Sequence, residues 1–204
     1  MSQTAHTEHV IDSESGKMGM WIFLFTELFL FGGLFLVYAV MRFRYSEDFH
    51  EAALELNALI GTLNTVVLLV SSMTVAMSIT AVQRGKNKQA VWFLLATLIL
   101  ALVFMINKYF EWSHKFHLHL YPGSPVMENL PHGEAQFFGL YYIMTGLHAV
   151  HVIVGAVLLI ISMRRVMSGK INKDKYLLLE NSGLYWHLVD LIWIFLYPLL
   201  YLVT

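Results

Sequence analysis

The chain has 204 residues, of which 57% are hydrophobic and 13% are charged, whereas a typical soluble domain carries about 25% charged residues. Long apolar segments account for the difference, so the composition predicts an integral membrane protein and excludes an ordinary soluble domain. A formal net charge of −1 argues against nucleic acid as a partner, and the absence of cysteine excludes disulfides, thiolate-ligated iron–sulfur clusters and covalently attached c-type haem.

Several apolar segments are long enough to cross a bilayer as helices, so the sequence predicts an all-α, polytopic membrane protein built as a five-helix bundle. Residues 1–16 are polar and lack the basic region and apolar core of a cleavable signal peptide. They are predicted to form a flexible tail ahead of a membrane domain at residues 17–204. The predicted spans are residues 17–41, 57–82, 90–112, 136–163 and 180–203.

The distribution of lysine and arginine predicts the orientation of the bundle. Cytoplasmic loops are enriched in these residues, so the N-terminus is predicted to be cytoplasmic and the C-terminus to lie outside, in the periplasm. The long connection at residues 115–134 is then expected to fold over the outer face. The predicted cytoplasmic connections hold Lys17, Arg84, Lys86, Lys88, Arg164, Arg165, Lys170, Lys173 and Lys175, and the others hold Arg42, Arg44 and Lys115.

The first predicted span contains one acid, Glu27, in an otherwise apolar sequence. An ionisable group inside a bilayer costs roughly 2.5–3.5 kcal/mol on insertion scales, so it is expected to face a partner. Two interpretations stay open: a proton relay or lipid-headgroup contact, or a structural hydrogen bond to a Ser, Thr or His on the next helix. Gly32 and Gly33 are expected to allow close approach of a neighbouring helix.

The fourth predicted span places His148 and His151 three residues apart, on one helix face. Such a pair could ligate a metal or belong to a haem pocket if other helices supply further ligands. The favoured interpretation is helix–helix hydrogen bonding, with Gly146 and Gly155 permitting close approach. Only the fourth and fifth spans carry histidine deep inside, whereas metal and haem sites need ligands from several helices.

The fifth predicted span carries Glu180, His187 and Asp190 within or at the edge of an apolar run. These groups are expected to turn inward, towards another helix, a partner chain or trapped water. His187 and Asp190 share a helix face and could hydrogen bond to each other. Trp186 and Trp193 add a broad aromatic surface, so this helix is expected to pack against a partner.

Two Glu-x-x-His spacings occur outside the deep parts of the spans, at Glu47…His50 and Glu111…His114. This is a spacing of di-iron carboxylate sites, but such sites need two further inward-facing carboxylates. None is available, so these residues are predicted to form a solvated polar rim, and no metal site is predicted. His117, His119 and His132 are assigned to the same rim.

Five motifs follow one another along the chain: Trp21…Glu27-Leu-Phe-Leu-Phe, Leu63-Asn64-Thr65, Lys108-x-x-Glu111-Trp…His114, Gly146-x-His148-x-x-His151-Val and Glu180…Tyr185-Trp-His-Leu-Val-Asp190. In this order they resemble subunit III of the haem–copper oxidases, in the five-helix form found in many bacteria. The similarity runs from about residue 17 to residue 203 and lacks the first two helices of the seven-helix members. That absence removes one wall of the lipid-filled cleft of the longer members, unless another subunit supplies it.

The resemblance implies an accessory subunit that holds no haem, copper or other cofactor of its own, since these reside in subunits I and II. It implies packing on subunit I near a proton-uptake path, bound phospholipid, and support of proton uptake and of turnover stability. The complex would reduce O2 to water and move protons outward across a bacterial plasma membrane. The implied proton-side or buried polar residues are Glu27, His148, His151, Glu180, His187 and Asp190; the lipid contacts are Glu27 and Arg165; the subunit-packing residues are Trp186, Trp193 and Asn64.

Other functions stay open at this point. The electron donor, cytochrome c or quinol, is bound by other subunits, and similar chains accompany quinol oxidases and nitric-oxide reductases. A stand-alone haem protein using His148, His151 and His187 is a second alternative. A small proton-coupled transporter is a third, although such proteins usually show inverted repeats or broken helices, and the sequence shows neither.

Overall fold

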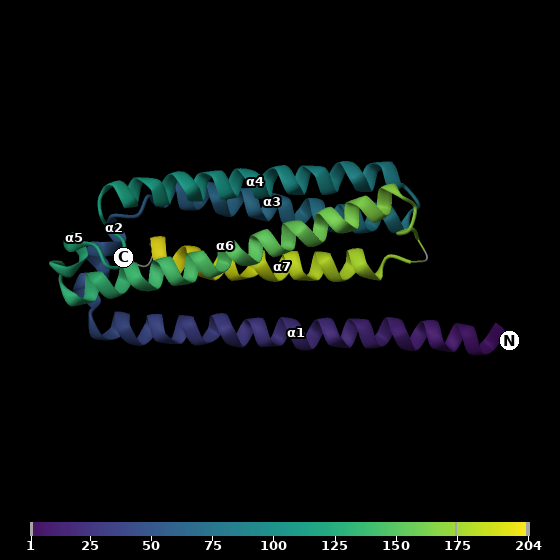
Figure 1. The fold of residues 1–204 in the computed structure, drawn as a ribbon, viewed down its shortest axis with the longest axis horizontal. Coiled ribbons are helices and arrows are strands. Elements are labelled where there is room, and N and C mark those ends of the chain that lie inside the picture. The colour runs from purple at the N-terminus through teal and green to yellow at the C-terminus, as the bar shows by residue number, and fades with distance from the viewer. Residues whose placement is uncertain (1, 174, 203–204) are drawn as a thin grey trace.

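The computed structural model describes residues 2–202 apart from residue 174, and the side chains of residues 15–202 apart from 128 and 174. The described chain is helical and its elements follow one another through short connections (Figure 1). They are α1 (Ser2–Arg44), α2 (Ser46–Leu54), α3 (Ala58–Gln83), α4 (Asn87–His117), α5 (Pro125–Glu128), α6 (His132–Met167), α7 (Leu177–Tyr197) and a closing π-helical turn, η1 (Pro198–Leu202).

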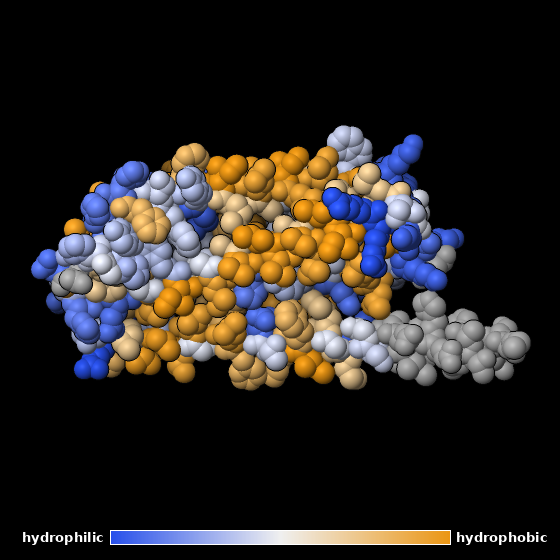
Figure 2. Space-filling model, in the orientation of Figure 1, coloured by the Kyte–Doolittle hydropathy of each residue, from blue (hydrophilic) through white to orange (hydrophobic). Residues whose placement is uncertain are grey.

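Among the described residues, 5 helical stretches are long and apolar enough to cross a bilayer. They confirm the five predicted spans, with ends that differ by a few residues. Figure 2 shows the corresponding surface, an apolar belt between two hydrophilic ends. The stretches are Ser15–Arg44, Ala58–Gln83, Asn87–His117, His132–Met167 and Leu177–Leu202.

The connections hold two short helices that the sequence analysis did not identify. α2 occupies the acidic segment after the first span, where Phe49, Ala52 and Ala53 turn a small apolar face inward. α5 begins at Pro125, and the preceding Ser124 side chain accepts a hydrogen bond from the Met127 N–H. The segment predicted as a tail, residues 1–16, belongs to α1 from Ser2 on; its flexibility stays a prediction, and Met1 lies outside the described residues.

α3, α4, α6 and α7 form a four-helix ring, because each packs on the next in the order α3–α4–α6–α7–α3. α1 lies outside this ring and packs along α6 and α7 (Figure 1). The most apolar stretch of α1 is only 11% buried, whereas that of α7 is 56% buried. α7 therefore forms the centre of the molecule, with α1 on one side of it and α3 on the other.

Polar contacts attach α1 to the ring at several points along its apolar stretch, Ser15–Arg44. The Lys17 ammonium lies 3.2 Å from the Glu180 carboxylate near one end. The Tyr38 hydroxyl donates a 2.6 Å hydrogen bond to the Leu199 carbonyl near the other end. Between them, Glu27 contacts α6 in an interaction described below.

The two ends of the bundle differ in charge. The N-terminus, the α3–α4 connection and the α6–α7 connection lie together at one end, and the C-terminus lies at the other with α2 and α5 (Figure 1). The first group contains most of the basic loop residues, as the sequence analysis predicts, and α2 supplies acidic ones. The assignment of the basic end to the cytoplasm stays a prediction.

Glycine permits close helix contact at Gly155 and not at the glycine pair of α1. A methyl group added at Gly155 would lie 2.8 Å from the Trp186 ring, inside van der Waals contact. At Gly32 and Gly33 the same addition meets nothing within 4 Å. Among the described residues, no helix of this chain therefore approaches Gly32 or Gly33 closely, because the side of α1 that carries them faces away from the ring; close approach by a helix of another subunit stays a prediction.

We expect Gly155→Ala to lower the free energy of unfolding by about 1–3 kcal/mol, because the new methyl group forces the Trp186 ring to move in a packed core. Gly139→Ala, in the same helix, is the matched control, since an added methyl group there meets nothing within 4 Å. It should be neutral or stabilising by up to about 1 kcal/mol. Thermal unfolding in detergent measures both; equal midpoints for the two variants would contradict the prediction.

Candidate functional site

Glu27 and His151 form a hydrogen-bonded pair between α1 and α6 at the middle of the bundle. The distance between Glu27 Oε2 and His151 Nε2 is 2.8 Å, and the side chains are 15% and 11% exposed. His151 Nδ1 lies 2.7 Å from the Leu147 carbonyl oxygen, which can only accept, so Nδ1 carries a proton. The remaining proton is therefore shared between Nε2 and the carboxyl group, as a carboxylic acid with a neutral imidazole or as an ion pair.

This arrangement supports the structural interpretation of Glu27, because its carboxyl group is hydrogen bonded to another helix. The partner is a histidine, as one interpretation expects, but it lies on α6 and not on the next helix of the chain. The Phe31 ring meets the imidazole edge at 5.2 Å and Tyr185 stacks on it at 6.4 Å, measured between ring centroids. Aromatic rings thus shield the pair on the side of the bundle.

His148 lies in a different environment from His151, although the two share a helix face. Its side chain is fully buried, and neither ring nitrogen has a hydrogen-bond partner among the described residues. Its ring lies 5.1 Å from Trp193 and 5.7 Å from Phe104, between centroids. Among the described residues, no three or more His, Asp or Glu side chains lie together so that they could hold a metal ion.

His187 and Asp190 do not bond to each other. The His187 Nδ1 atom lies 2.6 Å from the Ser72 hydroxyl on α3. The Asp190 carboxyl is 2% exposed and, among the described residues, has no hydrogen-bond partner of good geometry. His148, His151 and His187 are the three histidines of the alternative haem site. His148 is buried among aromatic rings, His151 bonds to Glu27 and His187 bonds to Ser72, so the three take part in separate contacts.

A buried ionic network lies between the middle of the bundle and the α2 end. The Lys108 ammonium lies 3.1 Å from Glu111 Oε2 and donates to the hydroxyls of Tyr141 and Tyr201 at 3.2 and 3.1 Å. Both hydroxyls donate in turn to Glu111 Oε1, at 2.6 and 2.5 Å. Lys108 also lies 5.4 Å from the centroid of the Trp193 ring. The network joins α4, α6 and η1 and compensates two charges removed from water.

Comparison with known sequences gives the family of this helical membrane protein. The family described as cytochrome c oxidase subunit III matches residues 1–204, the whole chain. The chain belongs to this family. It is therefore a multi-pass membrane subunit of the haem–copper oxidases, a group in which subunit III works together with subunit I.

The similar proteins include subunits named for cytochrome c oxidases and subunits named for quinol oxidases. "Cytochrome c oxidase subunit 3" of Thermostichus vulcanus is 30% identical, over 92% of this chain and 87% of the relative. "Probable quinol oxidase subunit 3" of Staphylococcus saprophyticus is 29% identical, over 98% of this chain and 96% of the relative. "Heme-copper oxidase subunit I+III" of Aeropyrum pernix is 28% identical over 92% of this chain, which spans only 22% of that longer protein.

The residues that the family resemblance assigns to subunit packing lie inside this subunit. Trp186 and Trp193 are 0% and 1% exposed, and their indole N–H groups donate to Ser71 and Thr65 of α3, both at 3.0 Å. Asn64 is fully buried and accepts a hydrogen bond from Asn107 at 2.8 Å. All three hold the subunit's own helices together, so they affect a partner subunit only indirectly.

The other two predicted residues lie at the basic end of the subunit. Glu180 pairs with Lys17 of α1, as described above. Arg165 is exposed near the end of α6, where its carbonyl oxygen accepts hydrogen bonds from the N–H groups of Lys170 and Ile171. Its contact with a lipid headgroup stays a prediction.

The solvated rim predicted at the outer end is correct in part. Glu47, His50 and His114 are exposed, but Glu111 is only 6% exposed. The burial of Glu111 was missed because its partners Tyr141 and Tyr201 come from distant parts of the chain. The sequence did contain one sign of this burial: Lys108 and Glu111 are three residues apart near the end of a span, so they lie on one helix face and can form an ion pair.

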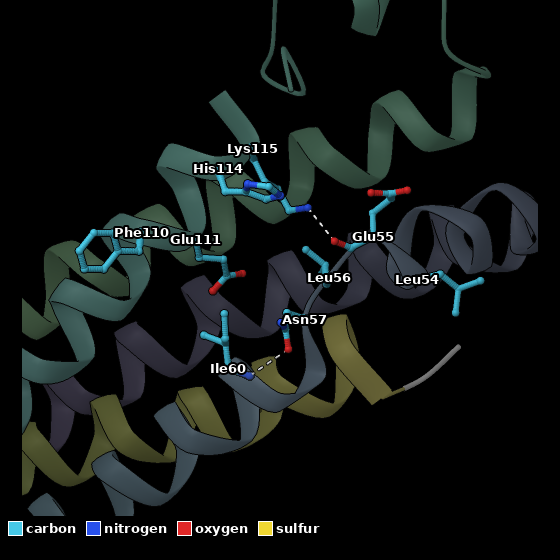
Figure 3. Close-up of a pocket in the computed structure, with 9 residues that line it drawn as sticks. All are labelled: Leu54, Glu55, Leu56, Asn57, Ile60, Phe110, Glu111, His114 and Lys115. Atoms are coloured by element: carbon cyan, nitrogen blue, oxygen red, sulfur yellow. Dashed lines mark hydrogen bonds between the residues drawn. The ribbon is translucent and has the colours of Figure 1, made fainter. Parts of the chain in front are cut away.

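A cavity of about 400 Å3 lies beside Glu111, between the α2–α3 connection and the end of α4 (Figure 3). Figure 3 shows the Glu111 carboxylate directed towards this space and the Lys115 ammonium directed to the Glu55 carbonyl oxygen, at 2.9 Å. Lys115 is 3% exposed, so the polar end of the subunit includes a second buried lysine that the sequence analysis placed in a loop.

We expect Lys108→Met to lower the free energy of unfolding by about 3–5 kcal/mol, because it leaves Glu111 buried without its counter-charge. The double variant Lys108→Met/Glu111→Leu should lose less than this single variant. Lys17→Ala is the control: its ion pair is exposed, with 48% of the Lys17 side chain accessible, and the loss should stay below about 1 kcal/mol. Chemical unfolding in mixed micelles measures the series, and a double variant less stable than Lys108→Met would refute the coupling.

Proposed function

We propose that this chain is an accessory subunit, without a cofactor of its own, of a proton-translocating terminal oxidase in a bacterial plasma membrane. The complex reduces O2 to water, with cytochrome c as the electron donor. Haem and copper belong to partner subunits I and II, and electrons reach them without passing through this chain. Within the complex, the subunit packs on subunit I, supports proton uptake and prolongs the active lifetime of the enzyme.

The observation that carries this proposal is the Glu27–His151 pair. Its two groups share one proton across 2.8 Å at the middle of the membrane span. The pair joins α6 to α1, whose apolar stretch is the least buried of the five. Both side chains keep a small exposed fraction. An ionisable group at this depth is a functional candidate by default, because its presence in lipid is costly. In this proposal, a neighbouring subunit can take up or return the proton of this pair without a large movement of the helices.

The proposed neighbours follow from the family and from the surface. The Aeropyrum relative, by its name, carries subunits I and III in one chain, which supports lateral contact between the two in the same membrane. Phospholipid is proposed to lie against the subunit beside α1 and α6, with Arg165 and Glu27 as contacts. The basic end faces the cytoplasm in this proposal, in accord with the positive-inside rule.

A quinol-oxidizing complex is the second candidate. The Staphylococcus relative bears a quinol oxidase name and covers 98% of this chain at 29% identity, about the same similarity as the cytochrome c oxidase relative. The subunit's role towards subunit I is the same in both complexes, and the donor differs only in other subunits.

We expect Glu27→Gln to leave assembly intact but to lower the proton uptake rate or shorten the active lifetime. The amide keeps a hydrogen bond to His151 but cannot release a proton. Glu47→Gln, a change at an exposed carboxylate on α2, is the control and should behave as the unmodified protein. Oxygen consumption and proton release over many turnovers measure both; an unchanged rate and lifetime in Glu27→Gln would leave Glu27 with a structural role alone.

The proposed function is tested by purification through a tag on the N-terminal segment in mild detergent. Mass spectrometry and a reduced-minus-oxidized optical spectrum then identify what copurifies. Haem bands together with a large multi-helix partner are expected, and a c-type haem partner would favour cytochrome c over quinol. A chain that purifies alone and colourless would overturn the proposal, and one that purifies alone with haem bands would identify its own histidines as ligands.

A further inference from the structure

A lateral surface between α3 and α7 differs in polarity from the rest of the apolar belt. We call it the α3–α7 seam; its members are Leu69, Ser72 and Met73 of α3 and His187 and Leu191 of α7. Leu69, Met73 and Leu191 are 48%, 58% and 44% exposed. Between these apolar side chains, Ser72 and His187 are half-buried and join the two helices through their 2.6 Å hydrogen bond.

The seam lies near the middle of the membrane. Ser72 lies near the centre of the span Ala58–Gln83, and His187 and Leu191 lie near the centre of Leu177–Leu202. The hydrocarbon core of a bilayer is about 30 Å thick, so lipid headgroups are roughly 15 Å away from such a position. Acyl chains are the only lipid atoms at this depth, and they offer no hydrogen bond.

His187 has hydrogen-bonding capacity that the chain itself does not use. Its Nδ1 atom is engaged by Ser72, whereas no described residue bonds to Nε2. An unpaired polar group that faces hydrocarbon costs several kcal/mol, so this surface is poorly suited to lipid.

The other lateral surfaces do not share this property. On α4, which lies diagonally across the ring from α7, the exposed residues at mid-depth are apolar, among them Ile99, Leu102 and Val103. On α6 they are Val150, Ile153 and Val154. The pair beside α1 satisfies its own hydrogen bonds, since Glu27 and His151 bond to each other.

We propose that the α3–α7 seam docks a transmembrane helix of subunit I, and that a side chain of this helix hydrogen bonds to His187 Nε2. Helices are the elements that cross a membrane with their own backbone groups satisfied. Hydroxyl, amide and histidine side chains are the usual groups that join them at this depth. The inference rests on the proposed function, which makes subunit I the neighbour in the membrane. It adds which face of this subunit meets that neighbour.

Photo-crosslinking in the intact membrane complex tests the seam directly. The probe p-benzoylphenylalanine is placed at Leu191 in the seam and, as the matched control, at Leu102 on α4, another mid-depth leucine, which is 59% exposed. The probe at Leu191 is expected to form an adduct with subunit I and the probe at Leu102 an adduct with phospholipid alone. Lipid adducts alone from Leu191 in an intact complex, or an equal yield of subunit I adducts from Leu102, would overturn the inference.

A second measurement uses the hydrogen bond itself. His187→Leu should lower the amount of subunit I retained after a detergent wash about three- to tenfold, as expected for one interhelical hydrogen bond in a membrane. His187→Gln, which keeps polar atoms, should retain more, and Leu102→Ala should be unchanged. If instead the seam faces lipid, His187→Leu removes a costly polar group and retention stays at the unmodified level. A preparation in which no oxidase subunit copurifies with the unmodified chain would overturn the proposed function itself.

Discussion

The structure depends on one constraint: a polar side chain inside a bilayer is costly unless it has a hydrogen-bond partner, because water is absent, and many of these partners lie on other helices. In lipid, apolar side chains do not drive helices together as they do in water. Hydrogen bonds between helices therefore set which helices meet and in what register. The indole N–H groups of Trp186 and Trp193 bond to two serine or threonine hydroxyls of α3 two turns apart. These bonds fix the register of α7 against α3 near the middle of the two helices.

The same constraint divides the polar groups of the subunit into two sets. Lys108, Glu111 and their two tyrosines satisfy one another completely within the chain, and burial of such a set serves to hold a unique arrangement of α4, α6 and η1. Glu27, His151 and His187 lie nearer the lateral surface: the first two bond to each other, and His187 keeps one ring nitrogen without a partner among the described residues. The first set explains how the bundle holds together, and the second contains the groups that we propose to act on neighbours.

The sequence predicted the spans well because a run of apolar residues needs no tertiary information to be recognised. It also identified Glu27, His151 and His187 as buried polar groups, since a charge in an apolar run is visible locally. Their partners were harder to predict. Whether Glu27 meets α3 or α6 depends on where α1 packs against the ring, and the local sequence does not encode that position. Glu111 was placed in a solvated rim for the same reason, because Tyr201 covers it only after the chain has crossed the membrane twice more.

The attachment of α1 has a consequence for biosynthesis. A membrane protein is inserted as it is translated, so α1 enters the bilayer before the rest of the described spans. Its polar contacts, however, are to His151, Glu180 and Leu199, which belong to the last two spans and the closing turn. These contacts of α1 are consequently completed only after α6, α7 and η1 have been made. Until α6 has been inserted, Glu27 lies in the membrane without its partner His151, and its carboxyl group is open to contact by another chain or a lipid.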